Sequence, residues 1–308
     1  MHDDSTDRIF DEIVEYPDPE IKRRYNRLVG LEVMKARLVK EAMMRLQPSS
    51  LEDWSQRHFK ESLPALAYFQ RRPPLFVLAG DVGTGKTELA ETFGDEVARK
   101  TRIPILLHSL SLTARGTGAV GEMTRLISAA FGILKSQAEP VANDTRANAG
   151  HILLIDEADA LAQSRESAQM HHEDRAGVNA LIRGIDDLAE GRRPVLIVMC
   201  TNRLSALDPA VVRRAAATFE FTRPNAEQRR MVLRYAFPEH ICSESEMTRI
   251  VELTGESSKL GVGFSFSDLT QRLIPSVILA AYPDHGISGD LIGTIASQTK
   301  PTPAFTGE

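Results

Sequence analysis

The chain contains the stretch Leu75-Phe76-Val77-Leu78-Ala79-Gly80-Asp81-Val82-Gly83-Thr84-Gly85-Lys86-Thr87, in which an apolar run leads into the pattern G-x-x-x-x-G-K-T. A helix-forming sequence follows, so the pattern predicts a phosphate-binding loop between a buried strand and a helix. Its glycines allow a tight turn whose amides point at phosphate oxygens, and the next helix adds its positive N-terminal end. A glycine turn without a ligand is the alternative, which the flanking strand and helix disfavour.

The residue types in this loop predict a site for a nucleoside triphosphate and Mg²⁺. Lys86 is expected to bind the β- and γ-phosphates, and the Thr87 hydroxyl is expected to bind Mg²⁺. The predicted nucleotide-binding residues of the loop are Gly80, Asp81, Val82, Gly83, Thr84, Gly85, Lys86, Thr87 and Glu88.

Composition excludes several classes of protein. The chain has 308 residues, an ordinary apolar fraction of 42% and a net charge of −5 without a dense Lys/Arg block, which argues against a dedicated nucleic-acid binder. Two cysteines, Cys200 and Cys242, are too few for a disulfide framework. No apolar run reaches membrane-spanning length and the N-terminus is acidic, unlike a signal peptide, so we expect a cytoplasmic protein.

Apolar runs alternate with helical segments after an amphipathic helix over residues 30–46. The alternation predicts an α/β fold with a parallel sheet and helices on both faces, whose ligands bind at the carboxyl ends of the strands. The five predicted strands are 75–80, 103–108, 151–156, 195–201 and 217–221.

Pro224 marks a change from this alternation to helical patterns alone. We predict a polar and charged N-terminal arm over 1–27 and a large α/β domain over 28–223. A small α-helical domain is expected over 224–299, followed by a disordered tail over 300–308.

A second chemical motif is the buried run Ile152-Leu153-Leu154-Ile155, which ends in Asp156-Glu157. An ionised carboxylate at the end of a buried strand is costly unless it meets a cation. Asp156 therefore fits as a carboxylate that holds Mg²⁺ directly or through water, alongside Thr87. Glu157 fits as the group that polarises an attacking water. Two acids that cap the next helix are the alternative.

Polar side chains also follow the fourth predicted strand. Asn202 would orient the lytic water or sense the γ-phosphate, although an Asn is equally common in a plain turn. Arg213 and Arg214 follow Asp208-Pro209-Ala210-Val211-Val212. Adjacent arginines are usually solvated, but an arginine from a neighbouring subunit would stabilise transition-state charge on the γ-phosphate. Spacing alone does not decide between these two roles.

Together these motifs resemble AAA+ ATPases in their order and spacing, from about residue 27 to residue 281. The resemblance matches Lys86 and Thr87 to Walker A, and Asp156 and Glu157 to Walker B. It also matches Asn202 to sensor 1. By the same resemblance Arg214, with Arg213 beside it, is the arginine finger, and the adenine pocket includes Gly30 and Leu31. It implies a helical lid, ATP and Mg²⁺ as cofactors and a homo-hexameric ring.

A narrower resemblance is to the pachytene-checkpoint, or thyroid-hormone-receptor-interactor, remodelers. It rests on residues 108–112, on 178–186 and on the segment from Thr201 to Ala215. That family converts or disassembles HORMA-domain proteins by pulling an N-terminal segment through a hexamer pore. Its bacterial members accompany a HORMA protein and a cyclic-oligonucleotide synthase, a nucleotidyltransferase, in anti-phage operons. The resemblance therefore implies an ATP hydrolase that remodels a HORMA-domain protein in antiviral defence.

The chain departs from the pattern of that family in three places. The first pore loop, near 115–121, lacks the usual aromatic, so grip is expected from Leu112, Arg115 and Val120. The second pore loop is expected to place His171 and His172 at the channel. At sensor 2, Ser267 stands where an arginine is usual, and Arg272 is nearby. We also expect the separate N-terminal recognition domain of that family to be missing or reduced.

Other functions are compatible with the same core. A loader or motor acting on nucleic acid is disfavoured by the acidic net charge and by the lack of an added DNA-binding domain. An unfoldase would need a separate protease, since the chain carries no H-E-x-x-H signature. A switch that binds ATP without generating force is the remaining alternative.

Overall fold

The computed structural model describes residues 9–111, 121–142, 145–160, 172–257 and 261–304. The chain forms two compact units. The large unit comprises Met1–Tyr25, Met34–Ala79 and Thr87–Glu220. The small unit comprises Asn26–Val33, Gly80–Lys86 and Phe221–Glu308, and thus includes the glycine-rich loop.

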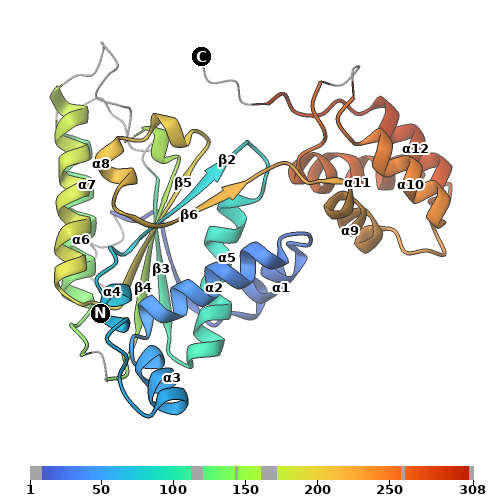
Figure 1. The fold of residues 1–308 in the computed structure, drawn as a ribbon. Helices are drawn as coiled ribbons and strands as arrows, with labels where there is room; N and C mark the ends of the chain where they lie inside the picture. Colours follow the sequence, from blue (N-terminus) through green and yellow to red (C-terminus); the bar gives the residue numbers. More distant parts are fainter. Residues whose placement is uncertain (1–8, 112–120, 143–144, 161–171, 258–260, 305–308) are drawn as a thin grey trace. The chain divides into compact units, whose positions relative to one another are not determined.

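A six-stranded sheet of order β1-β3-β4-β5-β2-β6 forms the centre of the large unit (Figure 1). The pairs β3–β4, β4–β5 and β5–β2 are parallel, while β1 pairs antiparallel with β3. Every residue of β5 is buried, as expected for a parallel strand covered on both faces. The strands are β1 (Glu12–Tyr16), β2 (Leu75–Gly80), β3 (Ile105–Ser111), β4 (Gly150–Asp156), β5 (Val195–Thr201) and β6 (Ala215–Phe221).

This architecture confirms the predicted α/β class with helices on both faces, but the sheet has six strands where the sequence predicted five. The added strand is β1, in the segment that we expected to be an arm. Its sequence is only five residues long and carries Glu12 and Glu15 beside an exposed Ile13, so it lacks the apolar run of a central strand. Pairing with one edge of β3 is what makes it a strand.

Helices cover both faces of the sheet (Figure 1), with α6 and α7 on one face and α2 and α5 on the other. The segment between α2 and β2 forms two helices, because Lys60 adopts a left-handed conformation that ends α3. The helices lying mainly in the large unit are α1 (Pro19–Arg27), α2 (Glu32–Leu46), α3 (Ser49–Phe59), α4 (Leu66–Gln70), α5 (Lys86–Thr101), α6 (Glu122–Gln137), α7 (His172–Glu190) and α8 (Pro209–Val212). No helix of the described part is long and apolar enough to cross a membrane.

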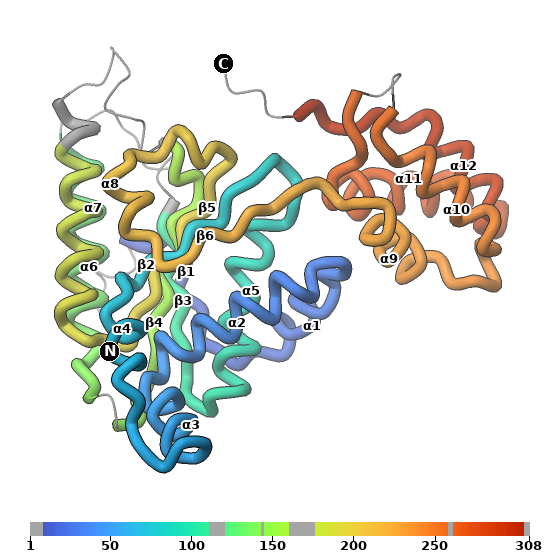
Figure 2. Tube along the Cα trace, in the orientation of Figure 1, coloured from blue at the N-terminus to red at the C-terminus, as the bar shows by residue number. Residues whose placement is uncertain are grey.

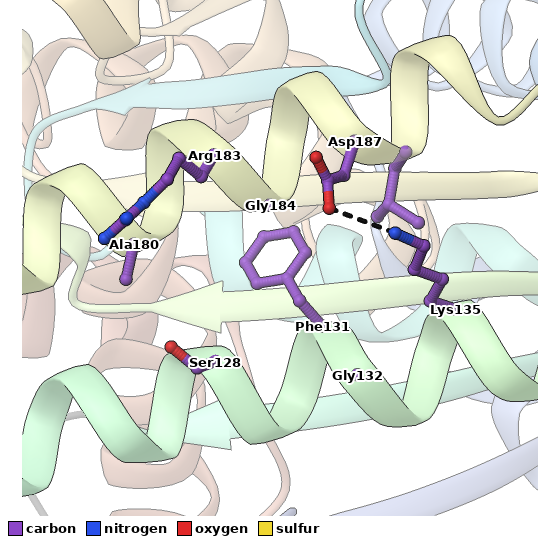
Figure 3. Close-up of a pocket in the computed structure, with 9 residues that line it drawn as sticks. Ser128, Phe131, Gly132, Lys135, Ala180, Arg183, Gly184 and Asp187 are labelled. Carbon is purple, nitrogen blue, oxygen red and sulfur yellow. Dashed lines mark hydrogen bonds and ion pairs between the residues drawn. The ribbon is translucent and has the colours of Figure 1, made fainter.

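The neighbouring helices α6 and α7 leave a shallow groove (Figure 3). A side chain at Gly184 would overlap the Phe131 ring, so the glycine allows the two helices to approach closely. Lys135 of α6 and Asp187 of α7 form an ion pair of 3.1 Å at one end of the groove. Phe131 belongs to the buried core beneath, together with Leu181 and Ile185.

The small unit contains a helical group, drawn in orange and red in Figure 2. Two of its helices begin with a capping box, in which the side chains of the first residue and a partner three positions later satisfy each other's amides, at Asn225 and at Ser243. These elements are α9 (Ala226–Ala236), α10 (Glu244–Leu253), the π-helix η3 (Asp268–Leu273), α11 (Ile274–Ala281) and α12 (Gly289–Gln298).

The described part of the C-terminal tail is bound to the small unit, in contrast to the disorder expected from residue 300. The Thr302 hydroxyl donates to Asp268 Oδ1 at 2.7 Å, and the Thr302 amide donates to the same carboxylate. Asp268 is fully buried, and a buried carboxylate needs donors. Thr302 supplies them, which local sequence around the prolines did not reveal.

Two histidines lie side by side inside the large unit. His108 of β3 and His151 of β4 are buried, and His108 Nε2 lies 3.1 Å from His151 Nδ1. Burial lowers the pKa of each imidazole from 6.5 to about 4, and for His108 the charge of His151 adds to the effect. Both rings are therefore neutral at neutral pH, and one donates the shared hydrogen bond while the other accepts it.

This pair predicts that the protein loses stability as the pH falls below about 6.5. The unfolded chain takes up protons between 6.5 and 4 while the folded chain does not, so each histidine removes about 2 kcal/mol of unfolding free energy between pH 7 and 5. His151→Gln should make the decline visibly shallower in urea unfolding at pH 7, 6 and 5. The exposed His240→Gln is the matched control, and equal slopes in all three proteins would contradict the assignment.

Candidate functional site

The glycine-rich loop of the small unit surrounds the Lys86 ammonium. Lys86 Nζ donates to the carbonyl oxygens of Gly80 and Asp81, each at 2.8 Å, and the residue is only 7% exposed. Gly83 and Gly85 have φ angles of +72° and +91°, which side chains rarely allow. The backbone of the loop thus curls around the Lys86 ammonium, which can donate hydrogen bonds to phosphate oxygens.

Neighbouring segments of the small unit hold this loop in place. A side chain at Gly80 would overlap the Phe221 carbonyl, so only glycine permits that approach. The Gly83 carbonyl accepts from the Ser267 amide at 2.9 Å. Arg223 Nε donates to Asp81 Oδ2 at 2.7 Å. Contacts with the segments after β6 and before η3 therefore determine the position of the loop within the small unit.

The predicted adenine segment lies beside the same parts of the small unit. The Gly30 carbonyl accepts from Gln228 Nε2 at 2.8 Å, and Gly30 has a φ of +88°. A side chain at Gly30 would stand 3.2 Å from the Phe266 ring, and one at Gly85 would stand 3.3 Å from Leu31. The buried Gly30 and Leu31 thus lie between the glycine-rich loop and the helical group of this unit.

In the large unit, the residue after the loop meets the end of a buried strand. Thr87 is the second residue of α5, and its Oγ1 lies 3.4 Å from Oδ1 of Asp156, the last residue of β4. A hydroxyl and a carboxylate are hard oxygen ligands of the type that Mg²⁺ accepts. The described residues hold no group of three or more His, Cys, Asp or Glu that could bind a metal alone. The pair therefore fits Mg²⁺ that keeps water and phosphate ligands as well.

Glu157 and Asn202 lie at the ends of the adjacent strands β4 and β5. Glu157 is exposed and has a φ of +50°, a conformation that a non-glycine residue holds only when its surroundings impose it. Its amide donates to Asp156 Oδ1 at 2.9 Å, which ties the turn to the strand end. The Asn202 amide donates to Asp159 Oδ1 at 3.2 Å. One sheet edge thus carries an exposed acid and a half-buried amide side chain.

The two adjacent arginines have different environments. Arg214 donates from Nε to Asp186 Oδ1 at 2.6 Å, from Nη2 to Asp186 Oδ2 at 2.8 Å and from Nη1 to the Ala210 carbonyl at 2.9 Å. The hydrogen bonds with Asp186 raise the pKa of Arg214. The Arg213 side chain is exposed and makes no hydrogen bond or ion pair with the residues that the structure describes. Asp208, which caps α8 through the Ala210 amide, fixes the turn that carries both.

The sensor 2 region binds the loop through its backbone. Arg272, the nearest arginine, donates to Asp268 Oδ1 at 2.9 Å and to Thr302 rather than to the loop. Ser265 and Asp268 form a reciprocal cap, in which the Ser265 amide reaches Asp268 and the Asp268 amide reaches Ser265. The Ser-x-x-Asp spacing could have indicated this cap.

Some of the remaining predicted site residues are not among those that the structure describes. Leu112, Arg115, Val120 and His171 lie outside the described residues, and His172 begins α7 with its side chain undescribed. Glu88 binds Arg24 of α1, whose Nε and Nη2 donate to its two carboxylate oxygens at 2.9 Å each. Sequence reasoning missed this pair and the contacts of Arg223, because each joins residues far apart in the chain.

Comparison with known proteins identifies a family and relatives to which this chain is similar. Residues 76–223 match the family described as "ATPase family associated with various cellular activities (AAA)". The chain is 50% identical over 302 residues to CD-NTase-associated protein 6 of Escherichia coli strain MS 115-1, over 98% of this chain and 97% of that protein.

Two solved structures are similar to the whole chain. One chain of the E. coli MS115-1 HORMA:CdnC:Trip13 complex aligns with a TM-score of 0.89 and 49% identity, over 98% of this chain and 99% of its own length. The structure of Rhizobiales Trip13 aligns with a TM-score of 0.76 and 43% identity, over 96% of this chain and 99% of its own length.

The contact between Gly83 and the sensor 2 region can be tested with Gly83→Ala. The new Cβ would stand 2.7 Å from Ser265 Oγ on a backbone with positive φ, so we expect a loss of about 2–4 kcal/mol of unfolding free energy. Thermal and urea unfolding measure it. Gly286→Ala, where a Cβ meets nothing within 4 Å, is the control. A Gly83→Ala protein as stable as the control would contradict the described contact.

Proposed function

Because this chain belongs to the AAA family of ATPases and is 50% identical to a CD-NTase-associated protein 6 over almost its full length, we propose that it hydrolyses ATP to remodel a HORMA-domain protein. The observation that carries the ATPase part is the contact of Thr87 with Asp156 directly after the lysine-holding loop. The HORMA:CdnC:Trip13 complex supports the choice of partner.

In this proposal the side chains act on ATP in distinct ways. The loop amides and Lys86 bind the phosphates, and the segment around Gly30 and Leu31 receives the adenine. Thr87 and Asp156 would hold Mg²⁺, which would neutralise negative charge on the phosphates. Glu157 takes the proton of the attacking water, and Asn202 orients that water. The exposed position of Glu157 on a constrained turn suits a base that must reach a ligand.

The proposed active form is a homo-hexameric ring. An arginine that stabilises charge on the phosphate of a neighbouring subunit must be accessible from outside its own subunit. Arg213 is exposed, and Arg214 is half-buried on the same turn, so both are candidates for this contact. A single subunit would then lack part of its own hydrolytic site, and assembly would switch hydrolysis on.

The proposed substrate is a HORMA-domain protein, which the ring pulls on when it is bound to a nucleotidyltransferase. The proposed setting is cytoplasmic anti-phage signalling. Purified chain mixed with a HORMA protein should show ATPase stimulation by that protein. Stimulation by DNA in its place would favour a nucleic-acid motor and overturn the proposal.

Glu157→Gln should separate binding from hydrolysis. Loss of the base is expected to lower the hydrolysis rate by about 10²–10⁴-fold while ATP binding persists, and the HORMA partner should remain bound to the variant. Steady-state hydrolysis, ATP binding and co-purification of the partner measure the three effects. Glu239→Gln, an exposed acid of the small unit, is the control. Normal hydrolysis by Glu157→Gln would show that the base is another residue.

The arginine contact should appear in mixed rings. Arg213→Ala and Arg214→Ala are each tested, and loss of the residue that acts across the interface should lower hydrolysis by about 10³-fold. Mixing that variant with Glu157→Gln should restore activity, because one subunit then supplies the intact acid and its neighbour the intact arginine. The exposed Arg249→Ala should behave as wild type. No recovery in either mixture would argue against action between subunits.

A further inference from the structure

Arg223 contacts two separate segments of the small unit. It lies between β6 and α9, and its Nε donates to Asp81 Oδ2 at 2.7 Å while its Nη1 donates to the Gly263 carbonyl at 2.7 Å. The side chains of Arg223 and Asp81 are 14% and 20% exposed, so water screens this ion pair only in part. Such a pair is more sensitive to loss of one partner than an exposed one.

Asp81 places a carboxylate inside the glycine-rich loop. Its carbonyl oxygen accepts from Lys86 Nζ at 2.8 Å, and its carboxylate accepts from the Val82 amide at 2.8 Å. The carboxylate therefore belongs to a residue that already contacts the phosphate-binding ammonium. Without a counter-ion it would repel a triphosphate and compete with it for Lys86.

We propose that Arg223 is a positioning residue for the nucleotide, which holds the Asp81 carboxylate and neutralises it so that Lys86 remains available to phosphate. This inference rests on the proposed binding of ATP to the loop. Arg223 acts through Asp81, and the Gly263 carbonyl fixes its guanidinium from the other side. A charged pair thereby makes an acidic residue compatible with an anion-binding loop.

The inference predicts opposite results for the two single substitutions. Arg223→Gln removes the positive charge 2.7 Å from the Asp81 carboxylate and should weaken ATP binding about tenfold at low salt, with a smaller effect at high salt. Asp81→Asn leaves an extra positive charge near the loop and should bind ATP more tightly than wild type. The double variant should recover to within about twofold of wild type, because no uncompensated charge remains.

A fluorescent ATP analogue titrated at two salt concentrations measures these dissociation constants. Arg223→Lys keeps the charge and should stay close to wild type, while Arg230→Gln, which breaks an exposed ion pair with Glu244, is the control. Steady-state kinetics should show the Arg223→Gln effect in KM rather than in kcat, since Glu157 is untouched. Unfolding without nucleotide identifies any variant that fails to fold, and the double variant then carries the test.

Equal weakening by Arg223→Gln and Asp81→Asn, with no recovery in the double variant, would overturn the inference and leave the pair as a structural link. The outcome is separable from the proposed function. A wild-type chain that fails to bind ATP would refute the nucleotide site itself. A wild-type chain that binds and hydrolyses ATP, without the expected pattern among the variants, would refute only the role of Arg223.

Discussion

The parallel pairing of β4, β5 and β2 is the constraint on which the candidate site depends. Ile155 is in register with Met199, and Thr201 with Ala79, so three consecutive strand ends reach the same edge of the sheet. Asp156, Asn202 and the start of the glycine-rich loop are the next residues along each strand. Because β5 is buried throughout, a register shift by one residue would exchange its apolar side chains between the two covered faces and disrupt the packing on both. Core packing thus determines where the polar residues lie at this edge of the sheet.

Carboxylates at this edge and in the small unit are each held by a specific donor. Asp156 meets the Thr87 hydroxyl, Asp81 meets Arg223, and Asp268 receives Ser265 and Thr302. The first of these is the only weak contact of the set, at 3.4 Å, and the hydroxyl and carboxylate there are the two groups that fit Mg²⁺. The shorter contacts instead hold the loop and its neighbours in position. The longer contact thus marks the proposed ligand site at Thr87 and Asp156, and the shorter contacts of Asp81 and Asp268 mark the framework around the loop.

The sequence predicted the α/β class and the strands that carry the motifs, because apolar runs and glycine turns are local signals. It did not predict β1, whose strand character comes from pairing with β3. It placed Thr87 and Asp156 together, and it located the adjacent arginines but not the partner of Arg214. That partner is Asp186, and its contact with Arg214 joins residues twenty-eight positions apart. Arg223 gave no local signal at all, because only the folded chain brings it to Asp81.

The contrast between Arg213 and Arg214 bears on how a ring could control hydrolysis. Arg214 is engaged by Asp186, but the side chains are 29% and 43% exposed, and ion pairs of this exposure typically contribute only about 0–1 kcal/mol. A phosphate on a neighbouring subunit would offer a stronger, doubly charged acceptor, so the pair with Asp186 does not prevent release of Arg214. The bidentate contact with Asp186 instead holds the Arg214 guanidinium in one orientation beside the exposed Arg213. A turn at α8 that is held by Asp208 and Asp186 would therefore reduce the conformational entropy lost in the proposed assembly.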